Sequence, residues 1–267
     1  MTDSFYFDNT NGVKTLRCRA LYDAGFEKHC FTTRIGGISR GFLAETNLSF
    51  SREERGTVLE NYRRVFAAVG FSGDIVLSNQ EHTDNVMTVD SGFKNRGFVI
   101  CNDAVDGFVT NERDLCLATF VADCVPIIIA DPVNTAVACV HSGWRGTAKH
   151  IAARAVEKMI ENYNSIPKNL IAAIGPCIGA CCYEVGRDVF DGFTETDVGF
   201  DRFFEEKPNG KYMLDLNGAN RAVLEGAGLC PENIHISYEC TCCNSELYYS
   251  HRATKGKRGN MAALIEI

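Results

Sequence analysis

Two apolar runs flank a short polar segment in residues 125–142, VPIIIADPVNTAVACVHS. The polar segment DPVN (131–134) is typical of a tight turn, because proline favours the first central position of such turns. Both runs have strand length and lack alternation of polar and apolar residues, which is typical of strands buried on both faces. The sequence therefore predicts a buried antiparallel hairpin, which requires a sheet covered by other layers.

Apolar patterns elsewhere predict the elements around this hairpin. Helical spacing indicates helices in 58–70, 146–163 and 214–228, with Gly70 and Asp215 as capping residues. Residues 74–89 indicate two strands joined by a loop that contains Gln80 and His82, and shorter apolar runs indicate strands in residues 114–124, 169–175, 233–239 and 261–267.

Some neighbouring strands have connections too short for a parallel crossover, so we expect a mixed sheet covered by helices. The predicted fold class is α/β, a three-layer α/β/α arrangement. We expect a single domain over residues 1–267. Within it, the sequence patterns say least about the structure of residues 1–27. No element is predicted for residues 191–213.

Composition excludes several classes of protein. A net charge of −7 argues against a general nucleic-acid binder, and no apolar run is long enough for a membrane span. The first residues, MTDSFYFDNTNG, lack the basic and apolar regions of a secretory signal. The thirteen cysteines are therefore expected to be reduced thiols, metal ligands or small core residues of a cytoplasmic protein.

The predicted hairpin places two metal-ligating residue types together. If DPVN is the turn, Asp131 faces Asn134, and the same register makes Cys124 and His141 a direct cross-strand pair. Their Cβ atoms would lie roughly 4.5–5.5 Å apart on one face, a separation that suits a shared metal ion. A slip of one residue would put them on opposite faces. The alternatives are a buried cysteine beside a structural histidine, or a cysteine–histidine nucleophile pair.

A third ligand must come from elsewhere, and His82 in the polar loop NQEHTDNV is the best candidate among the six histidines. His29 and His235 lie in or beside apolar segments, which favours structural roles. His150 is expected on a helix surface, and His251 lies in a loop where it could contact substrate. Three protein ligands with one open position describe a catalytic zinc site.

Two arginines are candidate phosphate ligands. Arg34 in TTRIGGIS and Arg145 in GWRG have glycines nearby, which let a backbone approach a ligand closely. Arg145 also precedes a predicted helix, whose N-terminus attracts anions. The alternative for each arginine is a role in stabilising a turn.

The remaining cysteines form two clusters, Cys177/Cys181/Cys182 and Cys240/Cys242/Cys243. The segment GPCIGACCYEVG does not match the nucleobase-deaminase signature, because Cys177 and Cys181 are four apart and no H-x-E precedes them. The two clusters together suggest either a structural zinc site or small thiols packed where backbones approach closely.

Several motifs, taken in order, resemble one family. They are TTRIGGIS, NQEH, DGFVT, ADCVPIIIAD, VHSGWRG, GPCIGACCYEVG, LDLNGANRAVLEGAG and CTCCNSELYYSHR followed by GNMAALI. From about residue 28 onward the chain is similar to the YfiH-like laccase-domain family. Members of that family have been called polyphenol oxidases, purine nucleoside phosphorylases and peptidoglycan editing factors.

The resemblance implies a three-layer α/β fold and a zinc ion held by His82, Cys124 and His141. Thr83 stands where the family usually has glycine. The implied activity is phosphorolysis of adenosine, inosine, guanosine and methylthioadenosine, accompanied by adenosine deamination, in a monomer or homodimer. Six histidines are too few for the copper sites of a multicopper oxidase, so zinc is expected rather than copper.

Roles for individual residues follow from this activity. Arg34, with Arg145 and the helix N-terminus, would hold phosphate, and His251 would contact substrate. Asp123 and Glu184 are candidates for the general acid only because they lie next to the motifs. The alternative functions are a hydrolase of cell-wall precursors that uses Cys124 as its nucleophile, and a copper-dependent polyphenol oxidase.

Overall fold

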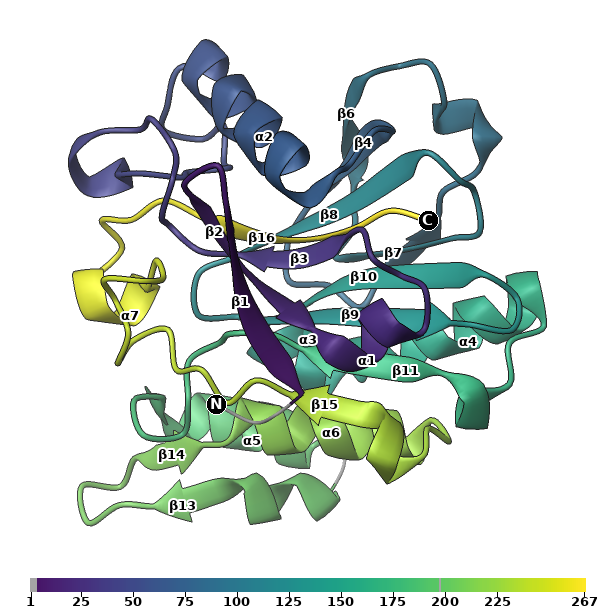
Figure 1. Cartoon of the computed structure of the whole chain (residues 1–267). Helices are drawn as coiled ribbons and strands as arrows, with labels where there is room; N and C mark the ends of the chain where they lie inside the picture. Colours follow the sequence, from purple (N-terminus) through teal and green to yellow (C-terminus); the bar gives the residue numbers. More distant parts are fainter. Residues whose placement is uncertain (1–3, 197) are drawn as a thin grey trace.

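Two mixed β-sheets packed face to face form the centre of the protein (Figure 1). The computed structural model describes residues 4–196 and 198–267. The first sheet has seven strands, which in spatial order are β1 (Phe5–Thr10), β2 (Val13–Cys18), β3 (His29–Thr32), β16 (Met261–Ile265), β8 (Leu115–Val121), β4 (Asp74–Asn79) and β6 (Phe98–Ala104). Neighbours from β1 to β8 are antiparallel, and β4 is parallel to both β8 and β6.

The second sheet has six strands and contains the predicted hairpin. In spatial order they are β15 (Ile234–Ile236), β11 (Ile171–Ile174), β9 (Val125–Asp131), β10 (Ala136–Ser142), β7 (Gly107–Thr110) and β5 (Val86–Thr88). The hairpin strands β9 and β10 are adjacent at its centre, and every residue of both strands is buried. The prediction of a buried hairpin is therefore confirmed.

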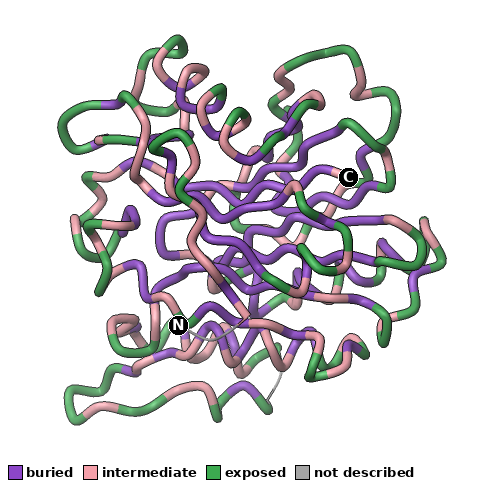
Figure 2. The backbone as a smooth tube through the Cα atoms, viewed as in Figure 1, coloured by how far each residue is buried: buried purple, intermediate pink, exposed green. Residues whose placement is uncertain are grey.

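Alternate side chains of β9 enter two different cores, which explains the layering. Ile128 and Ala130 pack in the core between the sheets, together with Leu117 of β8. Ile127 and Ile129 point the other way and pack in the core that contains α4 (Ile151–Tyr163). The α/β class with mixed sheets is confirmed, while the β layer consists of two stacked sheets where one was expected. Figure 2 shows this centre as a block of buried backbone surrounded by exposed loops.

Helices cover the outer faces of both sheets (Figure 1). The helix α2 (Arg55–Val69) packs on the first sheet, and α4 and α6 (Leu216–Gly226) pack on the second. The remaining helices are α1 (Arg19–Asp23), α3 (Trp144–Ala148), α5 (Arg187–Thr194) and α7 (His251–Thr254). Among the described parts of the chain, no helix has the length and apolar content required to span a bilayer.

The predicted helix caps are found, but one predicted helix is divided. Gly70 ends α2 with a left-handed φ of 90°, and the Asp215 side chain accepts a hydrogen bond from the amide of Gly218 at the start of α6. The helix expected over 146–163 is split into α3 and α4, because His150 has a φ of 61°.

The segment 191–213, for which no element was predicted, contributes two of the three strands of a small third sheet. This sheet consists of β12 (Glu184–Val185), β14 (Tyr212–Leu214) and β13 (Phe204–Glu206), with a 3-10 helix at Val198–Phe203. Its aromatic side chains pack against each other, for example Phe204 of β13 edge-on to Tyr212 of β14 with ring centroids 6.0 Å apart. These aromatic contacts join strands too short to give a periodic signal in the sequence.

Candidate metal centre

Three connections that cross from the first sheet to the second carry the candidate site. They link β4 to β5, β6 to β7 and β8 to β9. His82 lies in the first connection, Asp106 in the second and Cys124 in the third, and His141 lies near the end of β10. The site is therefore assembled where the chain repeatedly changes sheets.

The hairpin register differs from the predicted one by two residues. Asp131 pairs with Ala136 and does not face Asn134, so His141 lies opposite Pro126. The Asp131 side chain accepts a hydrogen bond from the main-chain amide of Asn134 at 3.1 Å, which stabilises a longer loop than the predicted tight turn. The expected direct cross-strand pairing of the cysteine and the histidine is therefore wrong.

The two-residue shift nevertheless leaves Cys124 and His141 close together. Side chains alternate between faces with a period of two, so a shift of two residues preserves the face on which each one lies. Cys124 lies immediately before β9, two positions ahead of the residue opposite His141.

The ligand atoms of His82, Cys124 and His141 all lie within 4.8 Å of one another. The Cys124 Sγ is 3.8 Å from Nε2 of His82, and the two imidazole rings are nearly perpendicular with centroids 4.9 Å apart. His141 is buried, Cys124 is half-buried and His82 is exposed. The three side chains therefore form one group with an open side, a donor set that fits a zinc ion.

Asp106 orients two of these three residues. Its Oδ1 accepts hydrogen bonds from Nδ1 of His141 at 2.8 Å and from the main-chain amide of His82 at 3.1 Å. Its Oδ2 accepts from both the amide and the hydroxyl of Thr83 at 2.7 Å. Because Nδ1 of His141 is used in this way, Nε2 is the nitrogen left for a metal ion. Sequence analysis missed Asp106, although a carboxylate directly before the buried strand GFVT was an available signal.

The charges of these side chains are coupled. Burial raises the pKa of the Cys124 thiol, but the neighbouring His141 and His82 outweigh burial and lower it to about 6. Burial lowers the pKa of His141, but the Cys124 thiolate and Asp106 outweigh it and raise this pKa to about 9. Burial also opposes ionisation of Asp106, yet hydrogen bonds from His141 and Thr83 lower its pKa to about 2. Without a metal ion, the Cys124 thiolate and the Asp106 carboxylate therefore hold a proton on His141, and a bound cation would take the place of the proton on Nε2 of His141.

Gly143 provides the space in which His82 and Cys124 approach each other. A Cβ at this position would lie 2.7 Å from Cδ2 of His82 and 3.3 Å from Sγ of Cys124. The first of these distances is shorter than any tolerated contact. The glycine after His141 and Ser142 is therefore required by the packing of the ligands.

A cavity of about 370 Å³ opens beside the three ligands. Its apolar lining includes Phe50, Ile100 and Phe120. Two residues of its lining each have one buried side-chain atom without a hydrogen-bond partner, namely Nε of Arg258 and Oδ1 of Asn260. Unpartnered buried polar atoms are costly, so these two atoms are candidate contacts for a ligand. Sequence analysis missed both residues, since Arg258 lies in the basic loop segment TKGKRGN without any distinctive spacing.

A second cavity of about 210 Å³ adjoins the first and shares Ser49, Ser51, Arg258 and Asn260 with it. His251 lines this second cavity. The predicted substrate residue therefore lines a cavity that adjoins the one beside the metal ligands.

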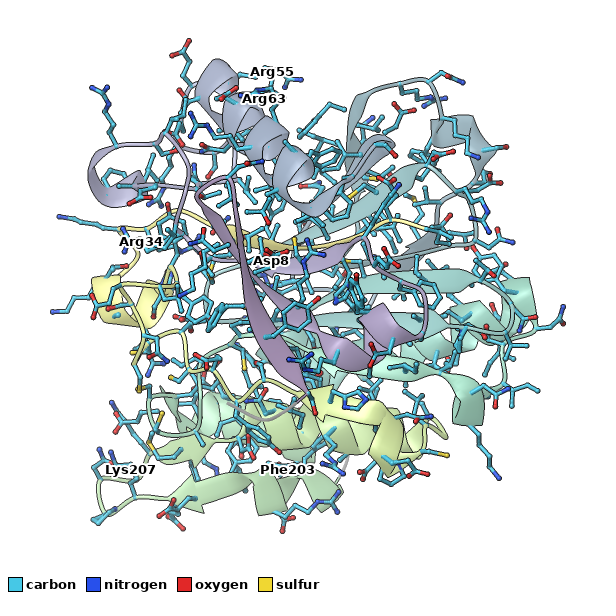
Figure 3. The ribbon with its side chains drawn as sticks, viewed as in Figure 1. Asp8, Arg34, Arg55, Arg63, Phe203 and Lys207 are labelled. Carbon is cyan, nitrogen blue, oxygen red and sulfur yellow. The ribbon has the colours of Figure 1, made fainter. Side chains whose placement is uncertain are left out.

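The two predicted phosphate arginines lie outside both of these cavities. Arg34 donates hydrogen bonds to the carbonyl groups of Ala44 and Ser245 and lies over the Tyr249 ring, on the side of the molecule that carries α7 (Figure 3). Arg145 is exposed and lies over the ring of Trp144 at 4.2 Å. The contacts of Arg34 are those of an arginine that stabilises a loop, whereas Arg145 contacts its neighbour within α3.

The two candidate acids are already paired. Asp123 is buried and accepts hydrogen bonds from the Thr241 hydroxyl at 2.6 Å and from the Arg252 amide at 2.7 Å. Glu184 forms ion pairs with Lys207 and Lys211, which lower its pKa to about 2. Lys207 projects from the small third sheet (Figure 3). Neither acid lines the cavity beside the metal ligands.

The remaining histidines lie apart from the ligand group. His29 is buried, with Nε2 accepting from the Cys18 amide and Nδ1 bonded to the Phe26 carbonyl. His150 packs against Phe200 and lines a different cavity. His235 is half-buried in β15.

Comparison with known proteins identifies the family. The family described as "Multi-copper polyphenol oxidoreductase laccase" matches residues 28–267. The chain belongs to this family. It is 35% identical to the purine nucleoside phosphorylase YlmD of Bacillus subtilis over 242 residues, which cover 88% of this chain and 86% of that protein. The structure of the Bacillus licheniformis protein YfiH superposes with a TM-score of 0.89 at 32% identity and covers 99% of both chains.

A further relative carries a different name. An adenosine deaminase from an unknown prokaryotic organism is 34% identical over 183 residues, which cover 67% of this chain and 70% of that protein. The resemblance to YfiH-like proteins that the motifs indicated is thus confirmed, and the relatives are named as enzymes acting on purine nucleosides.

Proposed function

We propose that this protein is a zinc-dependent purine nucleoside phosphorylase that acts on adenosine, inosine, guanosine and methylthioadenosine and also deaminates adenosine. The observation that carries the proposal is the meeting of His82, Cys124 and His141 beside a cavity lined by Arg258, whose Nε has no hydrogen-bond partner. The names of the relatives supply the substrate class, purine nucleosides and phosphate.

Zinc suits the donor set better than the copper of the family description. Imidazole and thiolate ligands bind both metals, but a multicopper oxidase needs additional imidazole ligands for each further copper ion. Among the described residues, the only metal-sized group that contains histidine is that of His82, Cys124 and His141. When bound, zinc would supply a Lewis acid that polarises a substrate oxygen or activates water.

The cavity offers separate surfaces for the two halves of a nucleoside. Phe50, Ile100 and Phe120 provide an apolar surface for the planar purine ring. The free Oδ1 of Asn260 can accept a hydrogen bond from a ribose hydroxyl. The Arg258 guanidinium can donate to phosphate, and its position at the junction of two cavities leaves room for an anion.

In this proposal, phosphorolysis depends on positioning the phosphate against the nucleoside, and it does not use Asp123 or Glu184 to transfer a proton. A phosphate oxygen attacks the ribose C1′ while the bond from C1′ to the base breaks, and the departing base takes up a proton from solvent. Arg258 holds the nucleophile, and Asp106 keeps the proton on Nδ1 of His141 so that this ligand stays correctly oriented. Deamination uses water as the nucleophile, so it does not depend on the phosphate contact.

The experiment compares adenosine turnover with and without phosphate in the same buffer. Adenine and ribose 1-phosphate should form only when phosphate is present, whereas inosine should form in both conditions. Adenine formation without phosphate would exclude phosphorolysis, and absence of any product from all four nucleosides would contradict the proposed substrate class.

One observation favours a second candidate, a cysteine hydrolase acting on cell-wall precursors. Cys124, His141 and Asp106 form a chain of thiol, imidazole and carboxylate, the arrangement used by many nucleophilic enzymes. In that case Cys124 attacks an acyl carbon, and the exposed His82 has no required role. Release of an amino acid from a cell-wall nucleotide precursor, with nucleosides unchanged, would favour this candidate.

A further inference from the structure

A second group of metal-ligating side chains lies outside the cavity just described. The sulfur atoms of Cys181, Cys182, Cys240 and Cys243 all lie within 4.8 Å of one another. Cys243 Sγ is 3.5 Å from that of Cys181 and 3.4 Å from that of Cys182, and Cys181 and Cys182 are 3.8 Å apart. We call these four residues the cysteine cluster.

The topology of the second sheet explains why two distant segments form this cluster. The strands β11 and β15 are parallel neighbours, so the loops that follow them leave the sheet at the same edge. Cys177 and Cys240 form an isolated parallel bridge that extends this pairing into the loops. One loop then supplies Cys181 and Cys182, and the other supplies Cys240 and Cys243.

The sulfur separations fit coordination of one metal ion. A zinc–sulfur bond of about 2.3 Å places the sulfurs of a regular tetrahedron about 3.8 Å apart. The three separations of 3.4, 3.5 and 3.8 Å are close to that value. A disulfide would instead require sulfurs at about 2.05 Å, and every cysteine of the chain is a free thiol in this structure.

We propose that the cysteine cluster is a second metal site, which binds one thiophilic ion, zinc in the first instance, through four thiolates. Each ligating thiol releases its proton to solvent, and no sulfur is oxidised. Four protein ligands leave no open position, so the site is structural and does not depend on the proposed nucleoside chemistry.

The surroundings of the cluster suit such an ion. Cys181 and Cys243 are exposed and give the ion a route of entry, while Cys240 is buried and accepts a hydrogen bond from the Gly179 amide at 3.2 Å. The Arg252 guanidinium donates to the Cys182 carbonyl at 2.9 Å, so a positive charge lies next to the negatively charged site.

The cluster would also hold the segment that carries Cys124. The Thr241 hydroxyl donates to the Asp123 carboxylate at 2.6 Å, and the Ile178 amide donates to the Asp123 carbonyl at 2.9 Å. Thr241 lies between two cluster cysteines, and Asp123 directly precedes Cys124. An ion bound to the cluster would therefore join two loops that both contact this segment.

The test counts metal ions in the full chain, purified under reducing conditions without added metal. Mass spectrometry should find two zinc ions per chain, and Cys181→Ser/Cys243→Ser should retain one. Conversely, His82→Ala/His141→Ala should lose one ion and keep the other. Cys230→Ser is the matched control, because Cys230 is a half-buried thiol outside the cluster, and it should retain both ions.

Cobalt substitution of the unmutated chain provides a second test, which does not require any variant to fold. The thiolate-to-cobalt absorption should be about fivefold that of a site with Cys124 alone, because four cluster thiolates then add to one. Absorption corresponding to a single thiolate would overturn the proposal. So would zinc content unchanged by Cys181→Ser/Cys243→Ser, or a mass two hydrogens lower that shows a disulfide within the cluster.

Discussion

Asp106 and His141 are joined by a hydrogen bond of 2.8 Å that links one sheet-to-sheet connection to the central hairpin. The same carboxylate accepts main-chain amides from the loop that carries His82. One buried side chain therefore sets the positions of two candidate metal ligands without belonging to the ligand group itself.

We expect Asp106→Asn to weaken zinc binding by roughly 10- to 100-fold, the usual effect of losing a residue that orients a metal ligand. The amide NH₂ of asparagine would face the donor amides of Glu81 and Thr83, so the loop would shift. Competition with a chelator measures the affinity. Asp131→Asn is the control: this carboxylate is also buried and accepts main-chain amides, but in the hairpin loop, so zinc affinity should be unchanged.

Removing any one of the three ligands should abolish zinc binding at this centre. Cys124→Ser, His82→Ala and His141→Ala should each lose more than about 100-fold in affinity, since the loss of a ligand exceeds that of an orienting residue. Phosphorolysis and deamination should disappear together, with an unchanged circular dichroism spectrum. His150→Ala is the control and should keep zinc and both activities, because His150 lines another cavity.

The same set distinguishes the metal ligand from the nucleophile. If Cys124 acts as a nucleophile, Cys124→Ser will be inactive with its metal content intact, and His82→Ala will have a mild effect. If the three variants unfold, the centre is structural and the proposed enzymatic role is wrong.

Arg258→Ala should raise the KM for phosphate by roughly 10- to 100-fold, because a charge-assisted hydrogen bond contributes about 1.5–3 kcal/mol. Deamination should change little, since it needs no phosphate. Arg34→Ala is the comparison: it removes contacts with Ala44, Ser245 and Tyr249, so it should lower the Tm and affect both reactions equally. A selective loss of phosphorolysis in Arg34→Ala would assign the phosphate contact to Arg34 after all.

Stability should fall as the pH decreases from 6.5 to about 4. Burial lowers the pKa of His29 from 6.5 to about 4, so in this range the unfolded chain binds a proton that the folded chain does not. The contribution of His29 to the free energy of unfolding is complete above pH 6.5. Up to about 3 kcal/mol of this contribution is lost as the pH falls to about 4. Urea unfolding at several pH values measures it. His29→Gln should flatten this dependence, whereas His235→Gln, at a half-buried position, should flatten it less.

Much of the site could be anticipated from local patterns. Cys124 and His141 lie at the ends of two apolar runs, and His82 lies in a polar loop between strands, so their residue types and positions were informative. Asp106 stood directly before the strand GFVT, but its partners belong to segments far away in the chain and could not be read from it, and Arg258 had no distinctive pattern at all. The predicted hairpin register was wrong by two residues. The prediction that Cys124 and His141 lie on one face was still correct, because side chains alternate between faces with a period of two.

The sequence by itself determined the longer helices α2, α4 and α6, the caps at Gly70 and Asp215, the buried hairpin and the family, because apolar spacing, capping residues and ordered motifs are encoded locally. The tertiary structure decided that the strands form two stacked sheets, since alternate residues of a strand buried on both faces can meet either helices or another sheet. It also decided which loops meet at the metal centre and at the cysteine cluster. Which loops come into contact depends on where the chain crosses from one sheet to the other. The packing of residues far apart in the sequence determines these crossing points.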